Sequence, residues 1–533
     1  MKASRRPFTC IQCLLLRPQG LGVRQFHCSP AFRSTVDPAA AAAAATAPPP
    51  PGRPSVAPKP VIDIKHIRQN PTLYEQNCLE RNYKAQAAYP ARIIQLFDQW
   101  QARQRQGRSL RERSNLLRRE LANPPTTRDD HDPALQELRA RSRDDLLAEA
   151  RDLKARLADI EADEDRLTDE MQRLAVAIPN LTSTATPRGP DPLVLSYIND
   201  HPEDHPDASD RVWRSHVHIG AELGLLDFAG AAATSGWGWY FLLNEAAQLE
   251  QALVSYALAA ATRAGWAQVS APSVVYAHIA DACGYRPRDA NGEQQIYALA
   301  PPLRPDSSNP TNRPEHVLAG TAEIPLAGMK ADTTLEEPDL PLRRVAVSRC
   351  FRAEAGARGA DTKGLYRVHE FTKVELFAWT APSESAATEL FDEMLDLQTD
   401  LLQSLGLHCR VLEMPSQDLG ASAWRKCDIE AFFPSRRDRN DGWGEVTSAS
   451  ICTDYQTRRL ATRARLGATG GKLAYPWTVN GTALAVPRVL AALLENGWDE
   501  SSMTVAVPEV LRPWMGGLEK IGGRHHLRTA SRP

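Results

Sequence analysis

Two segments near the middle of the chain read CFRAEAG (350–356) and GLYRVHEFTKVE (364–375). Their apolar and β-branched residues predict two strands, and the glycines between them predict a connecting loop. Because side chains alternate between the two faces of a strand, such a hairpin would direct several polar and aromatic groups to one site. The residues that would converge there are Arg352, Glu354, Phe371 and Glu375. A cation suits phosphate, carboxylates suit amines and a ring suits a base, so the hairpin is a candidate nucleotide site.

The sequence around this hairpin has an α+β texture. Short apolar runs such as 345–347 and 374–376 occur among helical patterns, without a repeated strand–helix–strand unit. Neither a GxxxxGK[ST] loop nor a GxGxxG turn after a strand is present in the sequence. If ATP binds, arginines must therefore hold its phosphates.

The wording FRxE followed by GLYRVHxFxKVE resembles motif 2 of the class II aminoacyl-tRNA synthetases in its seryl form. Other segments follow in the order of that family, between about residues 61 and 517. They are TAE (321–323), DIE (428–430), EVTS (445–448), DYQTRR (454–459) and NGT (480–482) leading to Arg488. The ordered set, rather than any single carboxylate, carries the resemblance.

The resemblance implies an α+β fold: a class II catalytic domain built on an antiparallel sheet flanked by helices, with an N-terminal antiparallel two-helix coiled-coil arm. It implies a serine–tRNA ligase that activates serine with ATP to seryl-adenylate and transfers it to tRNA(Ser). The alternative is a catalytically inactive, synthetase-like RNA-binding paralogue. That alternative predicts loss of Arg352, Glu375, Glu445 or Arg488, and all four are present.

The same resemblance assigns ATP and Mg²⁺ contacts. Arg352 is expected to grip the α-phosphate, Phe371 to stack on adenine and Arg488 to hold the γ-phosphate. Glu445 and Ser448 are expected to hold Mg²⁺ through the phosphates. The implied ATP-binding residues are Arg352, Ala353, Glu354, Val368, His369, Glu370, Phe371, Glu445, Val446, Thr447, Ser448 and Arg488. Fixed cations are needed because the serine carboxylate attacks a phosphate and two anions must approach. The catalytic set is therefore Arg352, Glu445 and Arg488.

A second set is implied to surround the ammonium and hydroxyl of serine. Its members are Thr321, Ala322, Glu323, Glu375 and Thr482. A site built to hydrogen-bond a hydroxyl rejects alanine, because its buried polar groups would be left unpaired. Threonine must be excluded by shape.

Residues 93–178 carry a heptad pattern that predicts the arm. The second half alternates spacings of four and three, and only Glu164 breaks its apolar seam. The seam positions are Leu146, Ala150, Leu153, Leu157, Ile160, Glu164, Leu167, Met171, Leu174 and Ile178. A weaker seam precedes it, through Ile93, Leu96, Trp100, Leu110, Leu117 and Leu121. Between the halves, NPPTT (123–127) predicts a reversal of the chain.

The arm has two interpretations that the sequence leaves open. Heptad segments commonly form dimerising or spacer coils, and charge runs are usually solvated faces. Arginine crowding favours RNA instead, because a row of arginines can neutralise backbone phosphates. These arginines are Arg103, Arg105, Arg108, Arg111, Arg113, Arg118 and Arg119.

The chain divides into four predicted parts: a mitochondrial presequence (1–36), an Ala/Pro-rich linker (37–60), a tRNA-binding domain with the arm (61–185) and a class II catalytic domain (186–533). Residues 1–36 hold several arginines, and no Asp or Glu occurs before Asp37. This composition predicts import into the mitochondrial matrix, with an unstructured basic tail as the alternative.

Composition excludes some other classes. The 63 Lys and Arg nearly balance 65 Asp and Glu, so RNA contact must come from a local patch. No apolar run of eighteen residues occurs, which predicts no membrane span. Of nine cysteines, three lie in the presequence, and the dispersed remainder predicts buried, reduced thiols rather than a zinc site.

An apolar-striped helix at 243–264 followed by VSAP (269–272) resembles motif 1, which implies a homodimer; a core helix in a monomer is the alternative. Three positions depart from the commonest seryl pattern. SGWGWY (235–240) lacks its usual arginine, Ile451 replaces asparagine, and Pro487 precedes Arg488. We interpret these departures as divergence rather than loss of activity.

Overall fold

The computed structural model describes residues 57–122, 137–138, 140–200, 213–285, 296–300, 314–354, 364–467 and 470–522. The predicted presequence, most of the linker and the reversal at 123–127 lie outside the described residues. So does the basic segment 524–528. What the sequence predicts for those segments therefore stays a prediction.

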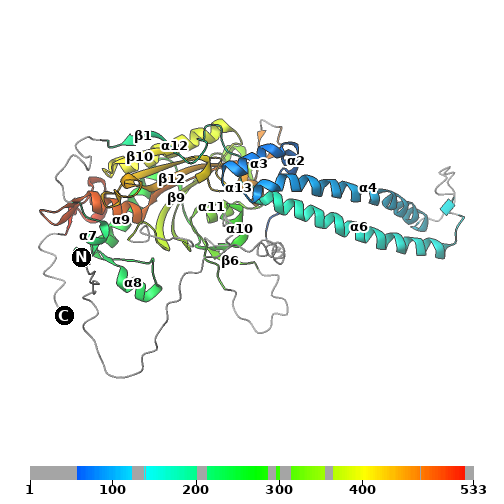
Figure 1. Ribbon diagram of the computed structural model, residues 1–533, viewed down its shortest axis with the longest axis horizontal. Coiled ribbons are helices and arrows are strands. Elements are labelled where there is room, and N and C mark those ends of the chain that lie inside the picture. Colours follow the sequence, from blue (N-terminus) through cyan, green and yellow to red (C-terminus); the bar gives the residue numbers. More distant parts are fainter. Residues whose placement is uncertain are drawn as a thin grey trace, which may run out of the picture. The chain divides into compact units, whose positions relative to one another are not determined.

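An eight-stranded sheet carries the catalytic half of the chain (Figure 1). In spatial order its strands are β1 (Leu193–Ile198), β10 (Cys409–Glu413), β11 (Arg425–Phe432), β12 (Trp443–Thr453), β15 (Trp477–Ala485), β9 (Glu370–Thr380), β8 (Leu342–Phe351) and β4 (Ala267–Ser270). Every neighbouring pair is antiparallel except β4 and β8, which are parallel. The antiparallel sheet that the motifs imply is confirmed.

Helices cover both faces of this sheet. Along β9, Leu376 and Ala378 belong to one apolar core, while Phe377 and Trp379 belong to a second core on the opposite face. The first core packs against α9 (Asn244–Arg263), α12 (Glu384–Ser404) and α14 (Val486–Asn496). The second packs against α10 (Ala277–Ala282), α11 (Glu323–Gly328) and α13 (Tyr455–Leu460). Burial on both faces explains why residues 376–379 of β9, LFAW, form a continuous apolar run.

Smaller elements complete the catalytic half. The helices are α7 (His216–Glu222) and α8 (Phe228–Ser235), with 3-10 turns at Glu337–Asp339, Ser416–Asp418, Pro434–Arg436, Asn440–Gly442 and Glu509–Met515. The strands are β2 (Leu226–Asp227), β3 (Phe241–Leu242), β5 (Val274–Tyr276), β6 (His316–Leu318), β7 (Thr334–Glu336), β13 (Arg463–Arg465), β14 (Leu473–Ala474), β16 (Trp498–Asp499), β17 (Thr504–Ala506) and β18 (Lys520–Gly522).

The heptad segment forms two long helices that lie side by side, α4 (Tyr89–Ala122) and α6 (Arg143–Ala177) (Figure 1). Two short helices, α2 (Ile64–Gln69) and α3 (Pro71–Glu80), and a 3-10 turn at Gln86–Ala88 precede them. Nine of the ten predicted α6 seam positions are buried, Glu164 among them, and Ala150 is half-buried. The two-helix arm is confirmed, and its seam follows the predicted spacing.

The charged break in the seam has a partner on the opposite helix. Glu164 is only 8% exposed, and both of its carboxylate oxygens accept hydrogen bonds from Arg111, at 2.9 and 2.8 Å. Gly107, one turn before Arg111, leaves the room: a Cβ there would lie 2.8 Å from the Arg111 guanidinium. A glycine inside a helix costs about 1 kcal/mol relative to alanine. The helix is therefore locally less stable at Gly107, where the missing side chain makes room for the Arg111 guanidinium.

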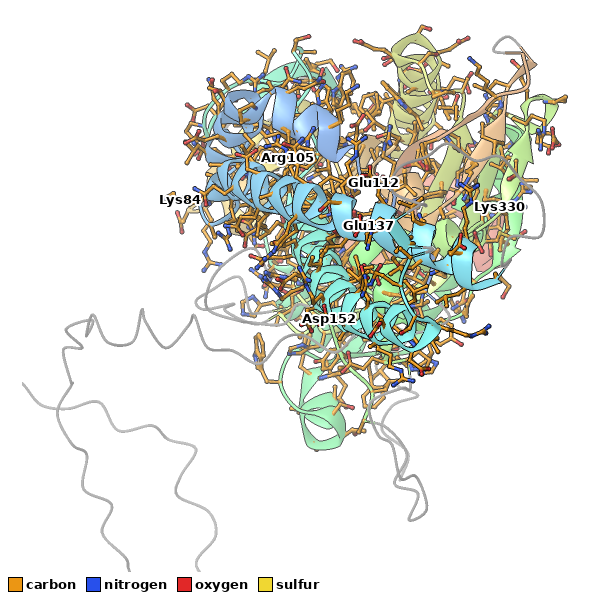
Figure 2. The ribbon with its side chains drawn as sticks, turned by 90° about the vertical axis from the view of Figure 1, so that its right-hand side faces the viewer. Lys84, Arg105, Glu112, Glu137, Asp152 and Lys330 are labelled. Atoms are coloured by element: carbon orange, nitrogen blue, oxygen red, sulfur yellow. The ribbon has the colours of Figure 1, made fainter. Side chains whose placement is uncertain are left out.

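The arginines of α4 divide into two groups. Four of them pair with α6 carboxylates across the arm: Arg92 with Glu170 at 3.0 Å, Arg103 with Asp163 at 2.9 Å, Arg111 with Glu164 at 2.8 Å and Arg113 with Glu149 at 2.7 Å. Arg105 and Arg118 are exposed. Figure 2 shows Arg105 and Glu112 on α4 and Asp152 on α6. Arg111 and Arg113 are the more buried members of these pairs and join the two helices, so the predicted RNA surface falls mainly to the more exposed arginines.

The base of the arm is tied to the catalytic half by a buried arginine. Arg81 is 0% exposed; it donates to the carbonyl of Asn180 at 2.6 Å and to the carbonyl of Gly420. Asn180 in turn donates through its amide to the carbonyls of Ser422 and Cys452, each at 2.9 Å. The segment around Gly420 and Ser422 also forms one wall of the cavity described next.

Candidate active site

A cavity of about 420 Å³ opens over β9, β11, β12 and β15. Twelve of the residues that the sequence implies for ATP and serine line it: Glu323, Arg352, Glu354, Val368, Phe371, Glu375, Glu445, Val446, Thr447, Ser448, Thr482 and Arg488. They come from segments more than 160 positions apart in the chain. The antiparallel order of the sheet brings them together.

Five other predicted residues do not line this cavity. Thr321 and Ala322 are fully buried, and the Thr321 hydroxyl accepts a hydrogen bond from the Glu323 main-chain N–H at 3.3 Å. Glu370 is turned to a different partner, because it accepts a hydrogen bond from Arg349 at 2.8 Å. The remaining two, Ala353 and His369, lie between lining residues along the hairpin.

One end of the cavity holds two buried carboxylates. Glu323 accepts hydrogen bonds from the Tyr285 hydroxyl at 2.8 Å and from the Gln456 amide at 2.6 Å. Burial, reinforced by the nearby charge of Glu375, raises the pKa of Glu323 to about 7. The Lys373 ammonium lies 2.6 Å from the Glu375 carboxylate, which also accepts a hydrogen bond from Thr482 at 3.2 Å. Two carboxylates and one ammonium leave a net negative site suited to a second ammonium.

The strand pair β8–β9 presents a cation beside a ring. The Arg352 guanidinium lies 5.1 Å from the centroid of Phe371, and both side chains line the cavity. Glu354 accepts a hydrogen bond from Arg367 and adopts a left-handed backbone conformation with φ of 49°. This is the arrangement that the hairpin predicts, with an arginine for phosphate and a ring for a base.

A third group combines a carboxylate with an arginine. Arg488 donates to the Glu445 carboxylate at 3.2 Å, to the Glu445 carbonyl at 2.9 Å and to the Tyr366 carbonyl at 3.0 Å. Desolvation opposes ionisation of Glu445, but Arg488, Lys426 and Arg352 outweigh it and lower the Glu445 pKa. The Glu445 side chain is nevertheless 41% exposed, because it borders the open cavity. It is an ionised carboxylate available to a ligand.

These groups fit the implied Mg²⁺ in one respect. Mg²⁺ usually takes one or two protein carboxylates together with substrate phosphates and water, rather than a complete protein cage. Glu445 offers such a carboxylate, and Ser448 on the same strand also lines the cavity. In the described part of the chain, no group of three or more His, Cys, Asp and Glu could hold a metal ion alone.

Sequence reasoning missed several polar residues of the cavity. Lys426, Lys373 and Tyr285 all line it. Lys426 lies 2.7 Å from Asp428, and burial raises the pKa of that aspartate despite the opposing ammonium. The pairs Lys373–Glu375 and Lys426–Asp428 are each spaced by two on one strand, so alternation along a strand could have found both lysines. Tyr285 gives no such signal, because a loop residue's position depends on the folded chain.

Two departures from the family pattern have a structural reason. Pro487 stands in the first turn of α14, where its missing N–H has no partner to lose and its fixed φ suits the helix. Ile451 is fully buried in the core beside Val479, and its neighbour Ser450 lines the cavity instead. Neither substitution removes a charge from the cavity.

Other predictions concern the whole chain. The six cysteines of the described residues are all free and buried. Across the described ranges, no helix combines the length and apolar character that a bilayer crossing requires.

Comparisons with known proteins agree with this geometry. A model described as "Seryl-tRNA synthetase N-terminal domain" matches residues 61–182, and one described as "tRNA synthetase class II core domain (G, H, P, S and T)" matches residues 308–497. The chain is 49% identical over 306 residues to the mitochondrial serine–tRNA ligase of Saccharomyces cerevisiae, covering 57% of this chain and 64% of that protein. It is 36% identical to the mitochondrial serine–tRNA ligase of Schizosaccharomyces pombe, covering 85% and 88%.

A solved structure supports the same relationship. The seryl-tRNA synthetase of Pyrococcus horikoshii, crystallised with ATP, superposes with a TM-score of 0.73 at 30% identity. The match covers 87% of this chain and all of that one.

Proposed function

The chain belongs to the seryl-tRNA synthetase family of class II ligases, which form seryl-tRNA from serine, ATP and tRNA, and we propose how its residues carry out that reaction. The single observation that supports the residue roles is the convergence of Arg352, Arg488 and Glu445 with the carboxylates Glu323 and Glu375 in one cavity. Cations for a triphosphate and anions for an ammonium thus lie within reach of one another.

ATP occupies the part of the cavity between Arg352 and Arg488. Phe371 stacks on the adenine, Glu354 and the main chain near Val368 read its edge, and Arg352 holds the α-phosphate. Arg488, fixed by Tyr366 and Glu445, holds the γ-phosphate and so the pyrophosphate that leaves. A Mg²⁺ held by Glu445 and Ser448 would neutralise phosphate charge when bound.

Serine binds between Glu323 and Glu375. Its ammonium pairs with these carboxylates and its hydroxyl meets the Thr482 hydroxyl. The serine carboxylate then attacks the α-phosphate, forming seryl-adenylate and releasing pyrophosphate. Arg352 stabilises the negative charge that accumulates in that transition state. A hydroxyl of the terminal ribose of tRNA(Ser) next attacks the acyl carbon, and AMP leaves.

The remaining assignments follow the sequence. Residues 61–185 are the tRNA-binding domain with its arm, and residues 186–533 the catalytic domain. The mitochondrial relatives and the acid-free segment 1–36 support a location in the mitochondrial matrix. An apolar groove beside β4 and β5, with Val274, Tyr276 and Met329 37–48% exposed, supports a homodimer.

The test is serine-dependent ATP–pyrophosphate exchange on protein lacking residues 1–36. We expect exchange with serine and none with alanine or threonine. Arg352→Ala should reduce the rate at least 100-fold, since one electrostatic contact to the transition state is worth about that much. Arg465→Ala is the matched control, because that arginine is 53% exposed and outside the cavity. A folded protein that supports no exchange would favour the inactive RNA-binding paralogue.

A further inference from the structure

An aromatic cluster surrounds His369 immediately beside the cavity. Trp237 and Trp239 flank Gly238, whose carbonyl accepts a hydrogen bond from the His369 main-chain N–H at 3.0 Å. Gly238 has φ of +83°, and a Cβ there would lie 2.5 Å from the His369 ring. Only glycine allows the main chain between the two tryptophans to approach so closely. The position that departs from the family pattern is thus the one that seats this cluster.

The rings are arranged around the imidazole. Trp239 stacks on His369 with centroids 6.0 Å apart, and Trp237 meets it edge to face at 5.7 Å. Tyr297 lies on another side at 6.2 Å, with its hydroxyl 3.0 Å from Nδ1. Trp237 remains 53% exposed, although a large apolar ring usually seeks burial. The cluster therefore presents a supported indole surface to solvent.

The aromatic cluster adjoins the cavity wall through His369. Arg352 donates its main-chain N–H to the His369 carbonyl at 2.9 Å, and the Arg352 carbonyl lies 3.0 Å from His369 Nδ1. Val368 and Arg352 line the cavity, while His369 does not. The aromatic cluster therefore begins one residue beyond the cavity wall, on the edge of the phosphate-binding hairpin.

We propose that Trp237 and Trp239 form a stacking platform for the unpaired bases at the 3′ end of tRNA. The proposal rests on the proposed function, because the terminal ribose must enter the cavity and the bases before it must lie outside. Every base offers a flat face to an indole, so stacking would hold the strand without reading its sequence. Rings that are already supported by His369 lose little freedom when a base stacks on them.

The test separates the two catalytic steps. Trp237→Ala should leave serine-dependent pyrophosphate exchange unchanged and lower kcat/KM for tRNA in aminoacylation about tenfold, the effect typical of one lost base–aromatic stack. Trp237→Phe should retain most of the original kcat/KM for tRNA, because it keeps an aromatic ring at this position. Trp514→Ala is the matched control, since Trp514 is 47% exposed on the 3-10 turn Glu509–Met515. A hairpin RNA ending in unpaired CCA should quench the fluorescence attributable to Trp237, and a blunt hairpin should not.

Two results would overturn the proposal. Equal tRNA charging by Trp237→Ala and the control would show that no base stacks there. Dissociation of a dimer by Trp237→Ala would assign the indole to contact with a second copy. Absence of exchange in the unmodified protein would instead contradict the proposed function, so the two failures are distinguishable.

Discussion

The arm and the cavity use the same charged residue types for different purposes. In the arm, the Arg103–Asp163 pair joins side chains that are 44% and 33% exposed, and such pairs contribute little to stability because water screens them. In the cavity, Lys373 and Glu375 are 8% and 1% exposed, so each charge depends on its partner. Between these two pairs, burial rather than residue type decides how strongly each charge depends on its partner.

The largest effect should follow from removing one member of the buried pair. Lys373→Met would leave the buried Glu375 without its ammonium partner and close to the charge of Glu323, and losing one partner of a buried pair costs about 3–5 kcal/mol. We expect a corresponding fall in the free energy of unfolding and a KM for serine raised more than tenfold, since the anion pair is no longer held in place. Thermal unfolding measures the loss of stability, and pyrophosphate exchange at varied serine concentration measures KM.

The matched control is Lys520→Met, because Lys520 is exposed on β18. It should change neither quantity. If Lys373→Met behaved like this control, the ammonium would not be holding the carboxylates, and the contrast between cavity and arm would fail.

A smaller effect should appear in the pH dependence of serine binding. Burial and Glu375 raise the pKa of Glu323 to about 7, so the carboxylate that would face the serine ammonium becomes charged only as the pH rises through 7. For one titrating group we expect KM for serine to fall about tenfold between pH 6 and pH 8. Glu323→Gln should abolish this slope, although its KM is higher throughout. A slope that persists in Glu323→Gln would assign the titration to another group.

The raised pKa of Glu323 also makes the stability of the ligand-free protein depend on pH. A carboxyl whose pKa is raised by folding binds more protons in the folded state between its unfolded value, near 4.5, and about 7. The free energy of unfolding of the ligand-free protein should therefore fall as the pH rises through that window. Glu323→Gln should remove this contribution, as denaturant titrations at pH 5 and pH 7.5 would show.

The two regions also differ in how far the sequence predicts them. The arm is predicted by a local heptad repeat, so the sequence alone indicates its apolar seam and the break at Glu164. Arg111 could not be identified as the partner, because the two residues are 53 positions apart and their contact depends on how the two helices align. The hairpin predicted Arg352 beside Phe371, and family resemblance supplied Glu445 and Arg488. Composition and spacing could not place Tyr285 on Glu323, because that contact joins a loop to the helix α11.

The smallest effect should come from Arg111 and Glu164, the pair that places a buried carboxylate in the seam of the arm. Replacing a buried ion pair by apolar residues is often neutral or stabilising by about 1–4 kcal/mol. Arg111 is 31% exposed, so only the low end applies, and Arg111→Leu with Glu164→Leu should slow hydrogen exchange in α4 and α6 by up to about tenfold. Glu164→Leu alone should speed exchange, since it strands the guanidinium. Pyrophosphate exchange should be unchanged in both variants. Faster hydrogen exchange in the double variant would show that the ion pair stabilises the arm more than an apolar seam does. Burial alone would then not account for the difference between the arm and the cavity.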